Sequence, residues 1–314
     1  MRALLTRMLD AGYEPEAICC SSDPHSLEGV IVHEKKVAIL DATAPHVCEP
    51  HVWGAVERIV NLSECMDNER LHARAAEIIE ITRENAALHA RSRRFITAAA
   101  TLLEENRRLP ARYTDKNKAL RVAERIAAVA FRDAPRGEGR EWKRFLSAVT
   151  PLGIRTFHST IQALCPCIYA VQDEHGAAAA ILMNAWREAA LKAELDVYTC
   201  RCPLSPTRIE HILIPSIGVA FTHSNPWHTV DYPVFRRIHA VRFTDEETLR
   251  RHKRLMRFNR RAAGDMLEQA VACAKEAKSV HDKLEEYSAA AMDWPRAESI
   301  TEKLIAEWLY LPET

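Results

Sequence analysis

The sequence predicts an α/β protein with two tandem parallel-sheet domains, each carrying a long helical extension. Three observations support this class: a segment that occurs twice, short apolar runs that alternate with helices, and long stretches of helical periodicity. Residues 1–46 and 183–228 align without a gap at an offset of 182, with ten identities in 46 positions, where average composition gives about three. Solenoid repeats are about 20–50 residues long, so an offset of this size indicates a duplicated domain.

Charge and composition restrict the partners of the chain. Lys+Arg and Asp+Glu both number 43, so no global field attracts nucleic acid or an anionic membrane. No apolar run approaches the roughly 20 residues of a membrane span, and the first residues become acidic too early for a signal peptide. Nine scattered cysteines favour a reducing compartment over a disulfide framework. We therefore expect a cytoplasmic protein without a membrane or nucleic-acid partner.

The first repeat is predicted to begin with a helix and continue into short strands. An amphipathic helix over residues 2–11 ends near Gly12, and glycine is favoured after a helix C-terminus. Short apolar runs then predict strands at Ala17–Cys20, Val30–His33, Val37–Asp41 and, more weakly, Glu57–Leu62. Because such runs alternate with helices, we expect parallel strands that are buried on both faces.

Helical periodicity dominates the rest of each repeat. It covers residues 68–108, 116–131, 248–291 and 295–309. The first two stretches correspond weakly to the last two at an offset of 178, in the same order. The segment 134–140 is the one linker that looks flexible, and it divides the chain into domains at 1–136 and 137–314. We expect these two halves to pack on each other.

The second repeat contains the setting of a phosphate-binding loop. A β-hairpin around Thr150–Gly153, a helix and a strand at Cys167–Val171 precede an eight-residue loop and a helix from Ile181. In the P-loop motif G-x-x-x-x-G-K-[ST], backbone N–H groups and a lysine bind the phosphates and a hydroxyl holds Mg²⁺. The eight positions here are Asp173, Glu174, His175, Gly176, Ala177, Ala178, Ala179 and Ala180. The lysine and the hydroxyl are both replaced by alanine, so this degenerate loop should not bind a triphosphate tightly.

Four segments together resemble an uncharacterised bacterial family of tandem P-loop ATPases that is described as nucleotide-kinase-like. They are CSSDPHSLEGVIV at 20–32, VAILDATAPH at 37–46, IEHILIP at 209–215 and VAFTHSNPWH at 219–228. The resemblance covers nearly the whole chain. It implies a P-loop NTPase-like domain in each half, ATP and Mg²⁺ as cofactors, and an unknown phosphoryl acceptor.

The sequence departs from this family in its two P-loops. The second P-loop is degenerate. The second repeat also has about 40 residues ahead of Met183 that have no counterpart in the first repeat, so we expect the first P-loop to lie in a similar segment before Met1. In the resemblance Val37–Asp41 is the Walker-B strand, and Asp41 is both a catalytic residue and the metal ligand. The alternative is that Asp41 caps the next turn. His223 occupies the matching position in the second repeat, so we interpret that repeat as a pseudo-domain.

Two further residue types recur at matching positions. Glu28 and Glu210 precede a strand, and we weigh a catalytic role against bonding of turn amides. His46 and His228 follow the Walker-B-like strand, on the side of an open α/β sheet where ligands bind. We therefore expect His46 to contact substrate or nucleotide.

The remaining candidate binding residues are a cluster of arginines and two pairs of cysteines. Arg250, Arg254 and Arg257 belong to the densest basic stretch and are candidate phosphate ligands, although a solvated helix face or a nucleic-acid contact would show the same pattern. The pairs Cys165/Cys167 and Cys200/Cys202 have the composition of a zinc site, but they lie at opposite ends of neighbouring strands.

Two functions remain open on sequence alone. One is an ATP-dependent enzyme, an ATPase or small-molecule kinase, in which Asp41, Glu28 and His46 act beside a P-loop that precedes Met1. The other is a non-catalytic pseudo-NTPase that serves as a nucleotide sensor or an interaction scaffold. For the chain as printed we expect no robust ATPase activity.

Overall fold

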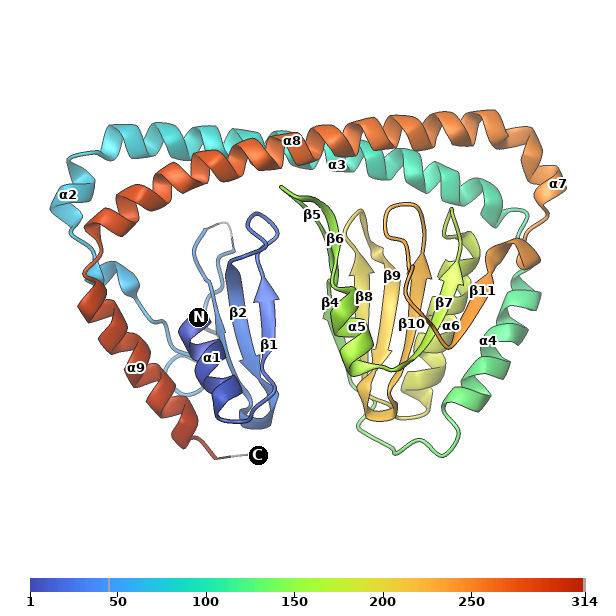
Figure 1. The fold of residues 1–314 in the computed structure, drawn as a ribbon, viewed down its shortest axis with the longest axis horizontal. Coiled ribbons are helices and arrows are strands. Elements are labelled where there is room, and N and C mark those ends of the chain that lie inside the picture. Colours follow the sequence, from blue (N-terminus) through green and yellow to red (C-terminus); the bar gives the residue numbers. More distant parts are fainter. Residues whose placement is uncertain (45, 313–314) are drawn as a thin grey trace. The chain divides into compact units, whose positions relative to one another are not determined.

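The structure is a computed structural model that describes residues 1–44 and 46–312 (Figure 1). It divides into two compact units. Unit 1 comprises residues 1–89 with the chain from 274 onward, and unit 2 comprises residues 90–273. The predicted division at 136/137 does not coincide with either limit and falls inside unit 2. The α/β class is confirmed, whereas P-loop domains in tandem remain a prediction.

Unit 2 is built on a six-stranded mixed sheet with the order β11-β7-β10-β9-β8-β4. Strand β9 is antiparallel to both of its neighbours, and the other adjacent pairs are parallel. The expectation of a purely parallel sheet was wrong, because the short connections on either side of β9 allow only antiparallel pairing. The strands are β4 (Glu141–Arg144), β7 (Cys167–Gln172), β8 (Val197–Cys202), β9 (Ser205–Ile214), β10 (Val219–Ser224) and β11 (Arg236–His239).

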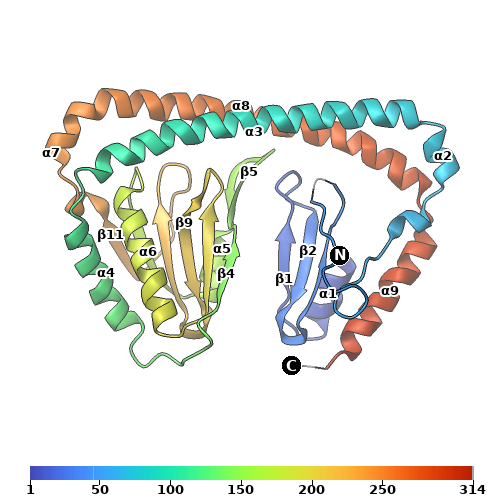
Figure 2. The same cartoon turned by 180° about the vertical axis from the view of Figure 1, so that it is seen from behind.

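Helices cover both faces of this sheet (Figure 2). Helices α4 (Lys116–Ala130) and α6 (Ala177–Lys192) share one apolar core with it, and α5 (His158–Leu164) packs in a separate core on alternate strand residues. Trp186 of α6 is fully buried, stacks on Phe221 at 4.2 Å and donates its indole N–H to the carbonyl of Ala123 in α4 at 3.1 Å. The predicted hairpin is present as β5 (Ser147–Thr150) and β6 (Gly153–Thr156).

Unit 1 contains a smaller sheet, of three antiparallel strands in the order β1-β2-β3. The strands are β1 (Glu16–Cys19), β2 (Leu27–Val32) and β3 (Val37–Leu40). The expected parallel arrangement was wrong here too, since only the short helix η1 (His33–Lys35) and Lys36 join β2 to β3. The predicted strand at Glu57–Leu62 is also absent: this segment is irregular up to η2 (Leu62–Cys65).

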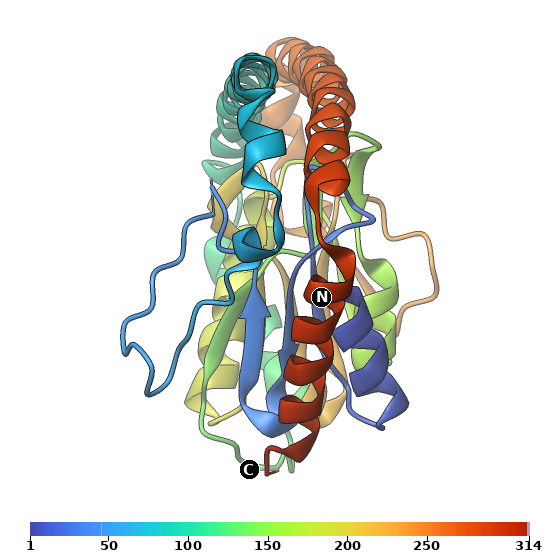
Figure 3. The same ribbon diagram turned by 90° about the vertical axis from the view of Figure 1, so that its left-hand side faces the viewer.

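The first helix of unit 1 packs against the last helix of the chain (Figure 3). These are α1 (Arg2–Asp10) and α9 (Trp294–Tyr310). Leu4 and Met8 of α1 share a buried cluster with Ile305 and Trp308 of α9. Thus a helix from the second sequence half completes the core of unit 1.

The duplication is visible in the elements themselves. The 3-10 helices η1 and η3 (Pro215–Ile217) lie 182 residues apart. Each is followed by a residue in the left-handed region, Lys36 with φ 49° and Gly218 with φ 63°. Strands β1, β2 and β3 likewise correspond to β8, β9 and β10. The repeat predicted from ten identities therefore extends to the backbone conformation.

Two long helices follow the strands of the two repeats. They are α3 (Ala75–Ala111) and α8 (Lys253–Ala291), preceded by α2 (Asn68–His72) and α7 (Glu246–Leu249). Helices α3 and α8 contribute to both units and pair antiparallel. In unit 2, Ser92 Oγ donates to the Ala270 carbonyl at 2.9 Å, and in unit 1 Leu88 packs with Ala277 and Val280. No helix of the described residues has the length and apolar character needed to cross a bilayer.

Matching hydrogen bonds show that the two repeats exchange their last helices. In unit 1, Asp67 N–H donates to the Ala291 carbonyl at 2.8 Å and Asp293 N–H to the Cys65 carbonyl at 2.7 Å. In unit 2 the same two bonds recur 178 residues away. They join Asp245 to Tyr113 at 2.9 Å and Asp115 to Phe243 at 2.7 Å.

These four aspartates also cap the helices that follow them, each by accepting an N–H three residues further on. Helix α4 of the first repeat therefore completes unit 2, and α9 of the second completes unit 1. The prediction that the two sequence halves pack on each other is confirmed. The linear domain boundary fails because the exchanged helices cross it.

The exchange makes unit 2 sensitive to substitutions in the first sequence half. Ala123 of α4 is 1% exposed, so Ala123→Glu would bury a carboxylate without a partner, and we expect a loss of more than about 3 kcal/mol. Ala128, on the exposed side of the same helix, gives the control Ala128→Glu, which should cost little. Urea denaturation followed by Trp fluorescence measures both. Equal effects would show that α4 does not pack on α6.

A partly buried ion pair joins the edge strand β4 to α6 and gives a second prediction. Arg187 donates Nε–H to Glu141 at 2.8 Å, and Thr199 Oγ donates at 2.6 Å. Hydrogen bonding from Arg187 outweighs burial and lowers the pKa of Glu141 to about 2. The carboxylate therefore contributes stability above its unfolded pKa of roughly 4.3, and this contribution is lost as the pH falls through about 2.

Glu141→Gln should remove up to about 3 kcal/mol at pH 7 and flatten the loss of stability between pH 5 and pH 2. The measurement is the free energy of unfolding as a function of pH for the wild type and the variant. Parallel curves for the two proteins would contradict this assignment.

Candidate functional site

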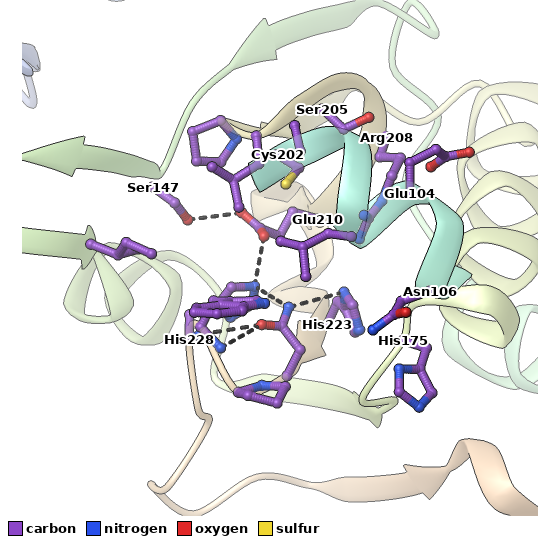
Figure 4. A pocket seen from close by; sticks show the side chains of 18 of the residues that line it. Glu104, Asn106, Ser147, His175, Cys202, Ser205, Arg208, Glu210, His223 and His228 are labelled. Carbon is purple, nitrogen blue, oxygen red and sulfur yellow. Dashed lines mark hydrogen bonds and ion pairs between the residues drawn. The ribbon is translucent and has the colours of Figure 1, made fainter. Parts of the chain in front are cut away.

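A small pocket lies in unit 2 between the first part of β9, the loop after β7 and the loop after β10 (Figure 4). Its cavity volume is about 50 Å³, far below the roughly 300–1,000 Å³ of typical small-molecule pockets. Its polar lining includes Ser147, His175, Arg208, Glu210, His223 and His228. A space of this size fits an ion or a few waters better than a nucleotide.

A β-bulge in β9 determines where Glu210 points. Cys200 pairs with His211 and Arg201 pairs with Ile209, so Glu210 has no partner residue on β8. Bulges change the direction of a side chain and are common beside functional sites. Unit 1 has the same irregularity at the matching position, because Ile18 pairs with Gly29 and Cys19 with Leu27. The bulged residue there is Glu28.

The Glu210 carboxylate is buried and paired. It lies 2.7 Å from His228 Nε2 and accepts a hydrogen bond from Ser147 Oγ at 2.9 Å, as Figure 4 shows. Both Glu210 and His228 have side chains that are only 4% exposed. Burial alone raises the pKa of Glu210, but the hydrogen bond with His228 holds it well below its usual range. The carboxylate is therefore ionised at neutral pH.

Unit 1 contains the same pair in a solvated form. His46 Nε2 lies 3.6 Å from Glu28 Oε1, and the two side chains are 57% and 28% exposed. Asp41 lies next to this pair, since its N–H donates to the Glu28 carbonyl at 2.7 Å. The structure thus brings together the three residues that the sequence nominated for catalysis. The Asp41 carboxylate accepts from Thr43 N–H at 2.9 Å and Oγ–H at 2.7 Å, which is the turn-capping geometry given as the alternative.

The degenerate loop is shorter than the sequence indicated. Helix α6 begins at Ala177, not Ile181, so only Asp173–Gly176 form the loop. Four consecutive alanines favour the helix, and Gly176, with φ 76°, takes the left-handed conformation just before it. The predicted eight-residue loop was therefore wrong, because residues 177–180 are helical.

Asp173 turns its carboxylate onto the backbone at the start of α6. Its Oδ2 accepts from Ala179 N–H at 2.9 Å and its Oδ1 from His175 N–H at 3.1 Å. The residue is 6% exposed. Backbone N–H groups at a helix N-terminus are the groups that bind phosphate in a P-loop. Here a carboxylate of the chain already accepts from them.

Unit 2 has no residues that fit Mg²⁺ at the positions where the P-loop motif would hold it, as the degenerate sequence predicts. His223, which matches Asp41 of the first repeat, donates Nε2–H to the Asp173 carbonyl at 2.7 Å. Burial lowers the pKa of His223, so the ring is neutral at pH 7. Mg²⁺ prefers oxygen ligands, and Ala179 and Ala180 supply neither lysine nor hydroxyl. ATP and Mg²⁺ thus find no P-loop chemistry in this unit.

The candidate arginines lie away from the pocket. Arg250, Arg254 and Arg257 are exposed, and none of them lines it. Arg260 does line it and pairs with Glu174. Arg208 lies against the loop, close enough that a Cβ on Gly176 would be 2.9 Å from its Nη2. The three nominated arginines therefore lie on a solvated surface, whereas Arg260 of the same stretch reaches the pocket.

The sequence did not identify His211, although it directly follows Glu210. In a regular strand the two side chains would point to opposite faces, and only the bulge brings them together. Of the cysteines considered for a zinc site, Cys165 and Cys200 are buried in an apolar cluster, and Cys202 lines the pocket.

No family model, curated protein or solved structure matches this chain. The contacts and chemistry of its own residues therefore carry the functional argument.

The repeated Glu–His pair provides a matched test of burial. Glu210→Gln should cost about 3–5 kcal/mol, because it leaves the buried partners of a charged group unmatched. Glu28→Gln should cost less than about 1 kcal/mol, because its pair is solvated. Urea denaturation of the two variants against wild type measures both losses. Similar losses would contradict the difference in burial between the two pairs.

Proposed function

We propose that unit 2 is a non-catalytic P-loop-like domain that acts as an interaction scaffold for the rest of the chain. The observation that carries this proposal is the Asp173 carboxylate, which accepts the N–H groups of His175 and Ala179 at the start of α6. A triphosphate would have to displace a buried anion that is already hydrogen-bonded. Asp173 therefore acts as an internal substitute for the phosphate.

Charge repulsion and the missing lysine both oppose the binding of a triphosphate. A triphosphate at the start of α6 would lie beside Asp173 and Glu174, and like charges repel strongly where water is excluded. The loop also lacks the lysine that would offset this repulsion, since Ala179 stands in its place. The domain thus retains a strand, a loop and a helix without the groups that recognise phosphate.

The scaffold role follows from what α6 binds instead. Its buried face packs against α4, a helix of the first sequence half, and Trp186 donates to a carbonyl of that helix. Unit 2 therefore already serves as the docking surface for a segment of the other repeat.

An ATP-dependent enzyme is the second candidate, and it concerns unit 1. The observation that favours it is the proximity of Asp41, Glu28 and His46. In this function Asp41 would hold Mg²⁺ and His46 would contact nucleotide or substrate. Asp41→Asn should abolish Mg²⁺-dependent ATP hydrolysis by any form of the protein that shows it, and unchanged hydrolysis would exclude this role.

Restoring the motif tests the scaffold proposal. The wild-type chain and Asp173→Asn should give no heat of binding when titrated with Mg²⁺·ATP. The combined variant Asp173→Gly, Ala178→Gly, Ala179→Lys and Ala180→Ser should bind weakly without hydrolysis. The new lysine contributes about 1.5–3 kcal/mol, or one to two decades of affinity. Adding His223→Asp should strengthen binding further.

Asp196→Asn is the matched control, because Asp196 also accepts backbone N–H groups in unit 2 but lies outside the loop. Tight Mg²⁺·ATP binding by the wild type, lost on substitution within residues 173–180, would refute the proposal.

A further inference from the structure

Three buried side chains of unit 2 form a compact group of potential metal ligands. Within residues 1–44 and 46–312, the ligand atoms of Glu210, His211 and His228 lie within 4.8 Å of one another. Glu210 Oε1 is 2.7 Å from His228 Nε2, and Glu210 Oε2 is 3.7 Å from His211 Nε2. A single ion between these atoms could reach all three with small side-chain movements.

An unpartnered nitrogen points into this group. His211 is fully buried, and its Nε2 makes no hydrogen bond. Leaving a buried polar atom unsatisfied costs roughly 1–3 kcal/mol, so such atoms call for an explanation such as a bound ion. His228 Nδ1 is likewise buried without a partner. The site thus contains polar atoms that the protein itself does not satisfy.

The other ring nitrogen of His211 has a hydrogen-bond partner, as is usual for metal-binding histidines. His211 Nδ1 lies 2.7 Å from Thr222 Oγ1. With the Nδ1 proton donated to Thr222, the Nε2 lone pair faces the Glu210 carboxylate, and two acceptors then face each other without a donor between them. A cation resolves this arrangement.

The ligand types select the metal. Two imidazoles and one carboxylate are a common set for catalytic Zn²⁺, with Zn–N distances near 2.0–2.1 Å and a position left for water. Mg²⁺ and Ca²⁺ prefer oxygen ligands throughout. The single carboxylate offsets half of the charge of a divalent ion, and the adjoining cavity of about 50 Å³ has room for a water on the open side.

We propose that Glu210, His211 and His228 form a Zn²⁺ site that opens onto this pocket. The first repeat supplies an internal comparison. It keeps the bulged Glu28 and the paired His46, but Gly29 occupies the position of His211. With only two ligands, both partly solvated, unit 1 should not retain the ion. The two repeats therefore differ by one ligand at otherwise matching positions.

The test uses the full chain after EDTA treatment, titrated with ZnCl₂ by calorimetry in competition with a weak chelator. We expect one Zn²⁺ per chain, a rise in Tm, and at least about 100-fold weaker binding for His228→Gln and Glu210→Gln. Glu28→Gln and His46→Gln are the matched controls and should bind like wild type. Circular dichroism shows whether each variant is folded.

A conservative variant keeps the test informative if a ligand substitution unfolds unit 2. Thr222→Val preserves shape and removes only the oxygen beside His211 Nδ1, so it should weaken Zn²⁺ about 10–100-fold. Co²⁺ in place of Zn²⁺ should give visible absorption without the charge-transfer band of a thiolate ligand. The proposal fails if the wild type takes up no Zn²⁺, if His228→Gln and Thr222→Val bind like wild type, or if a thiolate band shows that cysteines hold the ion.

Discussion

Two buried carboxylates determine the binding chemistry of unit 2. Asp173 is 6% exposed and Glu210 is 3% exposed, and an ionised group at such depth must be fully hydrogen-bonded or paired. Asp173 meets this need by accepting the N–H groups at the start of α6. Glu210 meets it with Ser147 and His228. The first arrangement closes the position that a phosphate would use, and the second gathers polar atoms at the bulge of β9.

The helix exchange gives the duplication a structural role. Two repeats that each kept their own last helix could fold as separate domains. Here Asp115 and Asp293 each begin a helix that completes the core of the unit built on the other repeat. Loss of either helix would expose apolar residues around Trp186 or Met8. The second repeat is therefore needed for the fold of unit 1, because its last helix supplies part of that core.

Sequence patterns predicted the individual helices and the hairpin well. They did not predict the orientation of the strands or the exchange of helices between the repeats. Helical periodicity identified α4 and α9, and turn residues identified the β5–β6 hairpin, because these depend on neighbours in sequence. The parallel arrangement was wrong even though the short Glu34–Lys36 turn already required antiparallel strands. The exchange of α4 and α9 could not be inferred, since the same apolar face would suit the core of either repeat.

The candidate site was likewise predicted only in part. Matching positions nominated Glu28, His46, Glu210 and His228, and the structure pairs them within each unit. His211 was missed because a bulge depends on strand pairing rather than on local sequence. The sequence identified Asp173 as one of the eight positions of the degenerate loop. Its hydrogen bonds to the helix start require the backbone coordinates.

We propose that unit 2 binds a metal ion at the Glu210 bulge and no phosphate at the start of α6. Anomalous diffraction at the zinc edge, from crystals of the full chain grown with ZnCl₂ and a non-hydrolysable ATP analogue, tests this most directly. The account predicts one anomalous peak about 2.0–2.2 Å from ligand atoms of Glu210, His211 and His228, with Asp173 still bonded to Ala179 N–H. Triphosphate density at the start of α6 with Asp173 displaced, and no zinc at the bulge, would contradict it.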